Sequence, residues 1–185
     1  MPHVGRRVWA VRHAATESSG ICVGDGDVPC MIPAEEAAAS IMALLGDSAV
    51  ICVWSSPRER CLGPARRVAQ RLGVSLRVDE RLREICLGQW QLKSWEAIDA
   101  ANPEGFRAWM TNWLTQAPPG GEVPAQVQER VEAWWQGLPG GDHLLVAHAG
   151  VMRALHVLVN GMSWAEAMRA DIPHLGGECF FHGER

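Results

Sequence analysis

The sequence predicts an α/β fold, a three-layer α/β/α sandwich with a mainly parallel sheet, formed by a single domain over residues 1–185. Short apolar runs alternate with segments of helical pattern along most of the chain, and parallel strands need such helical crossovers. The length corresponds to about one domain. With 48% hydrophobic residues, the chain has enough apolar side chains to cover both faces of a sheet.

Five segments have the composition of β-strands. They are residues 7–11, 49–54, 74–78, 144–147 and 179–181. Each is rich in apolar or β-branched residues, which is typical of strands covered on both faces. We therefore expect all five to be buried in the sheet.

The helices between these strands are indicated by their ends. Residues 33–45 begin with a proline and stop at a glycine, which is the usual start and stop chemistry of a helix. Residues 66–72 also end at a glycine. The start of this second helix stays open between Pro57 and Pro64, because a proline interrupts helical hydrogen bonding.

Residues 89–141 break the alternation and are predicted to form a helical insertion over the active site. Asn102 and Pro103 open one helix there, and Pro124 opens another. Apolar residues recur at helical spacing in both, namely Phe106, Trp109, Trp113, Val127, Val131 and Trp134. Each helix therefore has one apolar face that must pack on something.

Composition excludes several classes of partner. The net charge is −4, with one lysine among 17 basic residues, so a nucleic-acid partner is not expected. The apolar runs are too short to cross a bilayer, and the N-terminus lacks the centre of an export signal, so no membrane partner and a cytoplasmic location are expected. The six cysteines are scattered without a C-x-x-C pair. Neither a metal nor another cofactor is predicted.

Polar residues follow three of the predicted strands. Arg12 and His13 follow the first, Arg60 comes shortly after the second, and His148 follows the fourth. Ligands of open α/β sheets bind beyond the carboxyl ends of the strands, so these side chains are expected to meet there. Guanidinium groups match the paired oxygens of a phosphate. The predicted ligand is a small-molecule phosphate monoester.

The chemistry at such a site would have to come from histidine. The chain has no nucleophile-elbow serine, no phosphate-binding P-loop and no cluster of metal-binding carboxylates. A neutral imidazole of His13 can attack phosphorus directly, and Glu84 can supply a proton to the leaving group. Taken singly, each residue also fits a structural role, as a core histidine or a member of a surface ion pair.

Four blocks of the sequence carry a family resemblance. Residues 11–16, V-R-H-A-A-T, resemble an R-H-G-x-T signature, and residues 55–60, S-S-P-R-E-R, resemble S-S-P-x-x-R. Residues 82–90 are similar to L-x-E-x-x-F-G-x-W, and residues 145–155 to V-x-H-G-G-V-I-R-A-L. In order and spacing these blocks resemble those of the histidine phosphatase superfamily, which has the phosphoglycerate mutase-like fold.

The resemblance implies a metal-independent phosphomonoesterase that forms a phosphohistidine. His13 would accept the phosphoryl group, and Glu84 would be the proton donor and later the base. The residues that would hold the phosphoryl group are Arg12, Arg60 and His148. Two alternatives stay open: a phosphotransferase of the phosphoglycerate mutase type, and a noncatalytic phosphate-binding module.

The resemblance also indicates a substrate class. Thr16, Ser19 and Gly24 would lie near the substrate. Residues 109–113 and 119–122 are most similar to the α-ribazole-5'-phosphate phosphatase branch, which acts in cobalamin synthesis. Tryptophans of the insertion are candidates to stack on the flat base of such a substrate.

Two alanines depart from the family pattern. Ala14 and Ala149 stand where the motifs have glycine. Their added methyl groups would be tolerated if the backbone there has negative φ.

Overall fold

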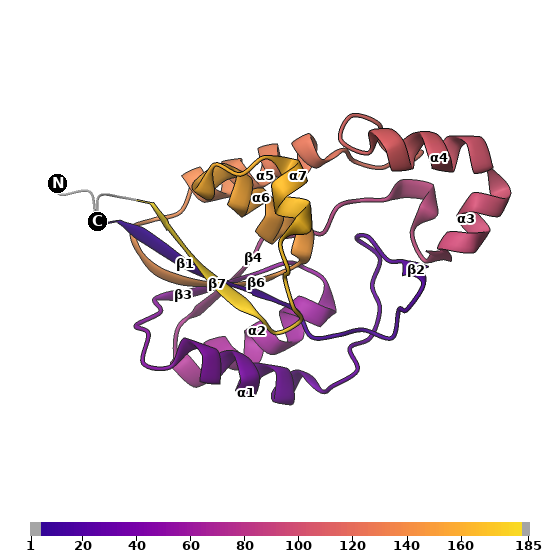
Figure 1. The fold of residues 1–185 in the computed structure, drawn as a ribbon. Helices are drawn as coiled ribbons and strands as arrows, with labels where there is room; N and C mark the ends of the chain where they lie inside the picture. Colours follow the sequence, from indigo (N-terminus) through magenta and orange to yellow (C-terminus); the bar gives the residue numbers. More distant parts are fainter. Residues whose placement is uncertain (1–4, 183–185) are drawn as a thin grey trace.

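The computed structural model describes residues 5–182 and has a five-stranded sheet in the order β4-β3-β6-β1-β7 (Figure 1). The strands are β1 (Arg6–Arg12), β3 (Cys52–Ser55), β4 (Ser75–Val78), β6 (Gly141–Ala147) and β7 (Gly177–His182). The first four run parallel to their neighbours, and β7 pairs antiparallel with β1. The predicted α/β fold with a mainly parallel sheet is confirmed.

Helices cover both faces of this sheet, which gives three layers (Figure 1). On one face lie α1 (Ala34–Leu45) and α2 (Glu59–Leu72), and on the other lie α5 (Pro124–Gln136), α6 (Ala149–Asn160) and α7 (Trp164–Arg169). Alternate residues of β6 point to opposite faces. Leu144 belongs to the core under α1 and α2, and Leu145 belongs to the core under α5 and α6.

Strand β4 is not buried as expected. It lies at the edge of the sheet with β3 as its neighbour, and Val78 is 49% exposed. An edge strand has a partner on one side, so composition alone overestimated its burial. β7 lies at the opposite edge and is also less buried than expected, since Cys179 is exposed. The other three predicted strands lie inside the sheet.

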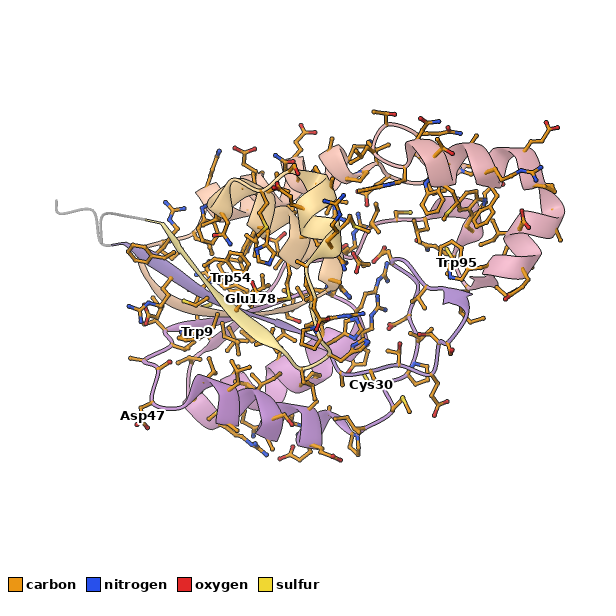
Figure 2. The ribbon with its side chains drawn as sticks, viewed as in Figure 1. Trp9, Cys30, Asp47, Trp54, Trp95 and Glu178 are labelled. Atoms are coloured by element: carbon orange, nitrogen blue, oxygen red, sulfur yellow. The ribbon has the colours of Figure 1, made fainter. Side chains whose placement is uncertain are left out.

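Helix α2 begins at Glu59 and continues through Pro64. A proline at this position cannot donate to the carbonyl of Arg60, one turn earlier. The thiol of Cys30 lies 3.9 Å from that carbonyl oxygen, close to α2 in Figure 2. The helix therefore tolerates Pro64, and Arg60 comes at the first turn, near the end of β3.

A second group of elements projects beyond the sheet, at the right of Figure 1. It contains η2 (Gly88–Trp90), α3 (Trp95–Ala101), α4 (Pro103–Asn112) and a two-stranded sheet of β2 (Ile21–Cys22) and β5 (Lys93–Ser94). Aromatic rings stack within it, including Trp95, labelled in Figure 2, on Trp109 with centroids 6.1 Å apart. No helix of the described residues is long and apolar enough to span a membrane.

Candidate active site

A small cavity of about 220 Å³, which we call the basic cavity, opens at the carboxyl end of β1. Its lining residues come from five segments: Arg12, His13, Thr16, Ser18, Ile21, Val23, Gly24, Arg60, Glu84 and His174. Six of the eight residues predicted for the site are among them. Ser19 and His148 are not, and His174 was not predicted.

The ring of His13 is oriented by its own backbone. Its Nδ1 lies 2.7 Å from the carbonyl oxygen of Ala14, and because a carbonyl can only accept, Nδ1 must carry the proton. The lone pair is then on Nε2. The pKa of His13 is lowered to about 3, mainly by burial and in smaller part by the nearby charge of Arg60. A neutral imidazole with a free Nε2 is the form that can attack phosphorus.

His148 lies directly beside His13, with ring centroids 5.1 Å apart and planes at 65°. Its side chain has no exposed surface, and burial lowers its pKa well below the ordinary value. Its Nε2 lies 2.8 Å from Ser56 Oγ, and Cys61 Sγ lies 3.5 Å from the same nitrogen. His148 therefore sits behind the cavity wall, held by Ser56.

Two arginines, Arg12 and Arg60, line the basic cavity. Arg60 donates to the carbonyl of Gly24 at 3.0 Å and to that of Gly26 at 2.5 Å, and Arg12 donates to Ile172 at 2.7 Å. Within the described part of the chain, the buried Nε of each arginine has no hydrogen-bond partner. The two guanidinium groups in this lining carry positive charge and match the paired oxygens of an anionic ligand.

Glu84 lies at the start of α6. Its carboxylate accepts from the backbone N–H of Gly150 at 3.1 and 3.2 Å and from that of Ile85 at 2.9 Å. The backbone N–H of Gly150, in the first turn of α6, is therefore occupied by Glu84. A Cβ at position 150 would lie 2.1 Å from Glu84 Oε1, so a side chain there would displace the Glu84 carboxylate from this position.

The segment that carries Glu84 is held by Arg130 of α5. Arg130 donates to the carbonyls of Arg81 at 2.6 Å, Arg83 at 2.7 Å and Glu84 at 3.1 Å, and it pairs with Glu122 at 3.1 Å. Sequence reasoning missed this role, because the carbonyls lie more than 40 positions earlier in the chain. Arg130 therefore holds the backbone around Glu84 in position.

Removing this arginine should cost both stability and activity. Arg130→Met leaves Glu122 half-buried and unpaired, so we expect a loss of about 3 kcal/mol in unfolding free energy and a lower kcat. Urea denaturation and steady-state kinetics measure the two effects. Arg66→Met is the matched control, since Arg66 forms an exposed ion pair with Glu59 and should change stability by less than about 0.5 kcal/mol. Equal losses in the two variants would contradict the role of Arg130.

The alanines that depart from the family pattern are accommodated. Ala14 and Ala149 are 1% and 6% exposed. In the described range the non-glycine residues with positive φ are Leu92 and Leu175, so neither alanine occupies the left-handed region. The backbone at both positions accepts an L side chain without strain.

The loop after β1 turns one serine inward. Ser18 Oγ lies 2.6 Å from Thr16 Oγ1, and both residues line the basic cavity. The amide of Ile21 donates to the carbonyl of Ser18 at 3.0 Å, which closes a turn and leaves Ser19 exposed. The structure thus brings Ser18, and not Ser19, to the site.

Burial of neutral His13 predicts how stability depends on pH. The unfolded chain protonates this histidine below about pH 6.5, whereas the folded chain keeps it neutral down to a pKa of about 3. The unfolding free energy should therefore fall on acidification across this window, by up to about 1.4 kcal/mol per pH unit. In His13→Asn this contribution is absent, so urea denaturation at a series of pH values should give a shallower fall. Identical slopes would contradict the buried neutral state.

An apolar cavity of about 520 Å³ adjoins the basic cavity. Its lining contains four tryptophans, Trp95, Trp109, Trp113 and Trp164, together with residues of α4, α5 and α7. Glu84 lines both cavities. The carboxyl group therefore stands where a phosphate in one cavity would be bonded to an apolar group in the other.

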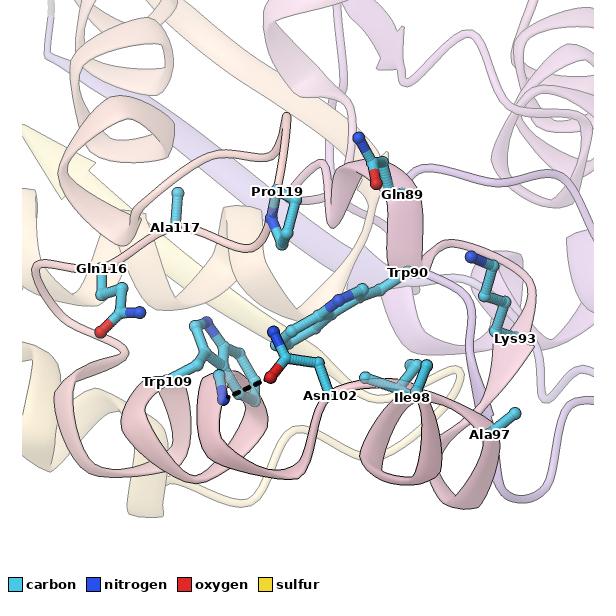
Figure 3. Close-up of a pocket in the computed structure, with 12 residues that line it drawn as sticks. Gln89, Trp90, Lys93, Ala97, Ile98, Asn102, Trp109, Gln116, Ala117 and Pro119 are labelled. Carbon is cyan, nitrogen blue, oxygen red and sulfur yellow. Dashed lines mark hydrogen bonds between the residues drawn. The ribbon is translucent and has the colours of Figure 1, made fainter.

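A third cavity of about 580 Å³ shares Trp109 with the apolar cavity (Figure 3). Trp90 and Trp109 line it together with the amide side chains of Asn102 and Gln116. It shares no residue with the basic cavity. Across residues 5–182, no group of three or more His, Cys, Asp or Glu side chains gathers in a way that could hold a metal ion.

Comparison with known proteins places this site in a family. The model of the histidine phosphatase superfamily (branch 1) matches residues 8–178. The adenosylcobalamin/alpha-ribazole phosphatase of Escherichia coli is 28% identical, over 88% of this chain and 82% of that protein. The glucosyl-3-phosphoglycerate phosphatase of Mycobacterium tuberculosis is 32% identical, over 93% and 81%.

A solved structure agrees at the level of the fold. The alpha-ribazole phosphatase from Shigella flexneri superposes with a TM-score of 0.83 at 24% identity, and the match covers 94% of this chain and 89% of that one. The family match spans the four sequence blocks and every segment that lines the basic cavity. The chain therefore belongs to the histidine phosphatase superfamily, branch 1, and is a phosphoric monoester hydrolase.

Proposed function

We propose that this hydrolase works through a phosphohistidine at His13 and cleaves esters whose leaving group carries a flat apolar ring, with α-ribazole 5'-phosphate, an intermediate of cobalamin synthesis, as the substrate. One observation carries the proposal. Glu84 lines both the basic cavity, which suits a phosphate, and the apolar cavity, which suits a ring. The proton donor thus stands at the bond to be broken.

In the first step, Nε2 of His13 attacks phosphorus and the bond from phosphorus to the ester oxygen breaks. The departing oxygen takes a proton from Glu84. The guanidinium groups of Arg12 and Arg60, which line the basic cavity, offer hydrogen bonds to the phosphoryl oxygens and counter their charge. The hydrogen bond from Nδ1 to Ala14 keeps the ring turned with Nε2 outward.

In the second step, water attacks the phosphohistidine. Glu84, now a carboxylate, takes a proton from this water, the bond between phosphorus and Nε2 breaks, and inorganic phosphate leaves. His13 returns to its neutral state with Nε2 free. Glu84 is held for this exchange by Gly150 and by Arg130, which fix its carboxylate and its backbone.

The apolar cavity favours one of the two substrate classes named for the relatives. A sugar acid would leave its hydroxyl groups unpaired against the four tryptophans, which disfavours it. A benzimidazole ring can stack on indoles and bury apolar area. Arg153 is the one basic residue among the described residues of this lining, and we expect it to donate a hydrogen bond to a ribose hydroxyl group.

A comparison of three substrates tests the proposal. We expect kcat/KM for α-ribazole 5'-phosphate to exceed that for glucosyl-3-phosphoglycerate and for 3-phosphoglycerate by at least about tenfold. Release of inorganic phosphate measures hydrolysis, and isomerisation of 3-phosphoglycerate measures the mutase alternative. Faster cleavage of the sugar-acid phosphate, or isomerisation as the main reaction, would contradict the assignment.

A tryptophan variant separates the cavity from the catalytic residues. Trp113→Leu should lower kcat/KM for α-ribazole 5'-phosphate by about 10 to 100-fold and leave that for 3-phosphoglycerate nearly unchanged. Trp9→Leu, in β1 and outside both cavities, is the matched control for loss of an indole. A loss of the same size for both substrates would show that Trp113 does not contact the leaving group.

A further inference from the structure

His174 is the second imidazole that lines the basic cavity, next to His13. It lies in the segment between α7 and β7, outside the four sequence blocks. Its ring centroid is 5.3 Å from that of His13, with the planes at 55°. His148, which the family resemblance assigned to the phosphoryl group, is at a similar distance but has no exposed surface. His174 therefore holds a position on the open side of His13 that no motif predicts.

The protonation of His174 follows from its hydrogen bond. Nδ1 lies 3.0 Å from the backbone carbonyl oxygen of His13, so Nδ1 must donate. In the neutral ring Nε2 is then an acceptor, and in the protonated ring Nε2 is a second donor. Burial lowers the pKa of His174, as does Arg12, while the bond to His13 opposes the shift.

The position of His174 excludes one role. In-line displacement puts the leaving oxygen, and later the attacking water, on the face of phosphorus opposite His13. A ring beside His13 cannot reach that face. The three equatorial oxygens of the phosphoryl group surround the axis that joins Nε2 of His13, phosphorus and the leaving oxygen. A ring beside His13 can reach one of these oxygens.

We propose that His174 contacts the phosphoryl group: it takes up a proton when a dianion fills the basic cavity and binds an equatorial oxygen through Nε2–H. The proposal rests on the proposed function, because it assumes that the basic cavity binds a phosphoryl group. Without a bound anion, burial and the neighbouring cation Arg12 disfavour a charged imidazole at position 174. A bound dianion reverses that balance.

The charged and titratable groups around His174 all bear on this exchange. Arg12 and His13 belong to the end of β1, Arg60 to α2, and Glu84 to the segment before η2, and each lines the same cavity. His13 keeps its single proton on Nδ1. Proton uptake that does not involve His174 is subtracted with a variant that lacks only the His174 imidazole.

Two substitutions separate the functions of the two ring nitrogens. In His174→Asn, the side-chain amide can replace Nδ1 as donor to the His13 carbonyl but has no group at the place of Nε2. In His174→Gln, the longer amide can replace Nε2–H as a neutral donor. Neither side chain titrates. His174 is an exposed residue in a loop, so both variants should fold. Circular dichroism checks that they do.

Calorimetry with sulfate tests the proposal, because sulfate does not titrate near neutral pH. Titrations in buffers of different ionisation enthalpy give the number of protons taken up on binding. We expect the wild type to take up close to one proton more than His174→Asn when sulfate binds. As the pH rises from about 6.5 to 7.5, the sulfate affinity of the wild type should therefore fall by up to tenfold more per pH unit than that of His174→Asn. At neutral pH we expect about tenfold weaker binding in His174→Asn and partial recovery, without the pH dependence, in His174→Gln.

The outcomes distinguish this inference from the proposed function. If the wild type forms a phosphohistidine and binds sulfate, but His174→Asn binds sulfate with the same affinity and proton uptake, His174 does not contact the anion and this inference fails alone. If the wild type neither binds sulfate nor forms a phosphoenzyme, both proposals fail.

Discussion

Replacement of His13 by alanine is expected to abolish turnover, with a loss in kcat of roughly 10⁵-fold or more. The reason is that the neighbouring imidazoles cannot substitute for it. His148 has no exposed surface and its Nε2 is engaged by Ser56. His174 has its Nδ1 bound to the backbone of residue 13 and stands beside the line of attack. The measurement is the release of inorganic phosphate from an aryl phosphate, because an aryl leaving group needs little protonation by Glu84.

A second substitution guards against misfolding as the cause. His13→Asn retains a donor for the carbonyl of Ala14 but has no nucleophilic nitrogen, so it should be folded and equally inactive. Thermal denaturation confirms that each variant is folded. Undiminished activity in either one would end the phosphohistidine mechanism.

Glu84→Gln is expected to separate substrates by their leaving groups. For an alkyl phosphate the alkoxide needs a proton, so kcat/KM should fall by roughly 10³ to 10⁴-fold. For an aryl phosphate the phenolate leaves with little help, and the loss should be about tenfold. Parallel kinetics with one alkyl and one aryl ester measure the ratio.

A backbone contact supplies the control for this variant. The Glu84 carboxylate accepts from Gly150 at 3.1 Å, and an amide side chain can keep that bond through its oxygen. A loss caused by displacement of the segment would affect both esters alike. Equal losses would therefore remove Glu84 from the acid role and leave it a positioning residue.

The fold was predictable because its signals are local. The apolar run at β6 and the proline and glycine at the ends of α1 carry their structure in the sequence. The short strands β2 and β5 carry no such signal, since two residues show no periodicity. Helix α3 was missed although Ser94 caps it by accepting from the amide of Ala97, which is a readable sign.

The site residues that follow predicted strands or lie in the sequence motifs were predictable. Arg12, His13 and Glu84 follow directly from them. Arg130 and His174 act through backbone carbonyls of segments distant in the sequence, and nothing in their neighbours marks them. The burial of His148 depends on how Cys61 and Ser56 pack around its ring, which only three-dimensional structure reveals.

The most direct test of the central claim is the identity of the phosphorylated atom. Wild-type enzyme is mixed with an aryl phosphate, and the reaction is quenched in alkali within the first turnover. The protein is then digested, and the peptide that carries the phosphoryl group is examined by mass spectrometry and phosphorus NMR. Because Nδ1 of His13 donates to Ala14, we expect phosphate on Nε2 of His13. Label on Nδ1, on His148 or His174, or full turnover with no phosphohistidine at any time, would contradict the claim.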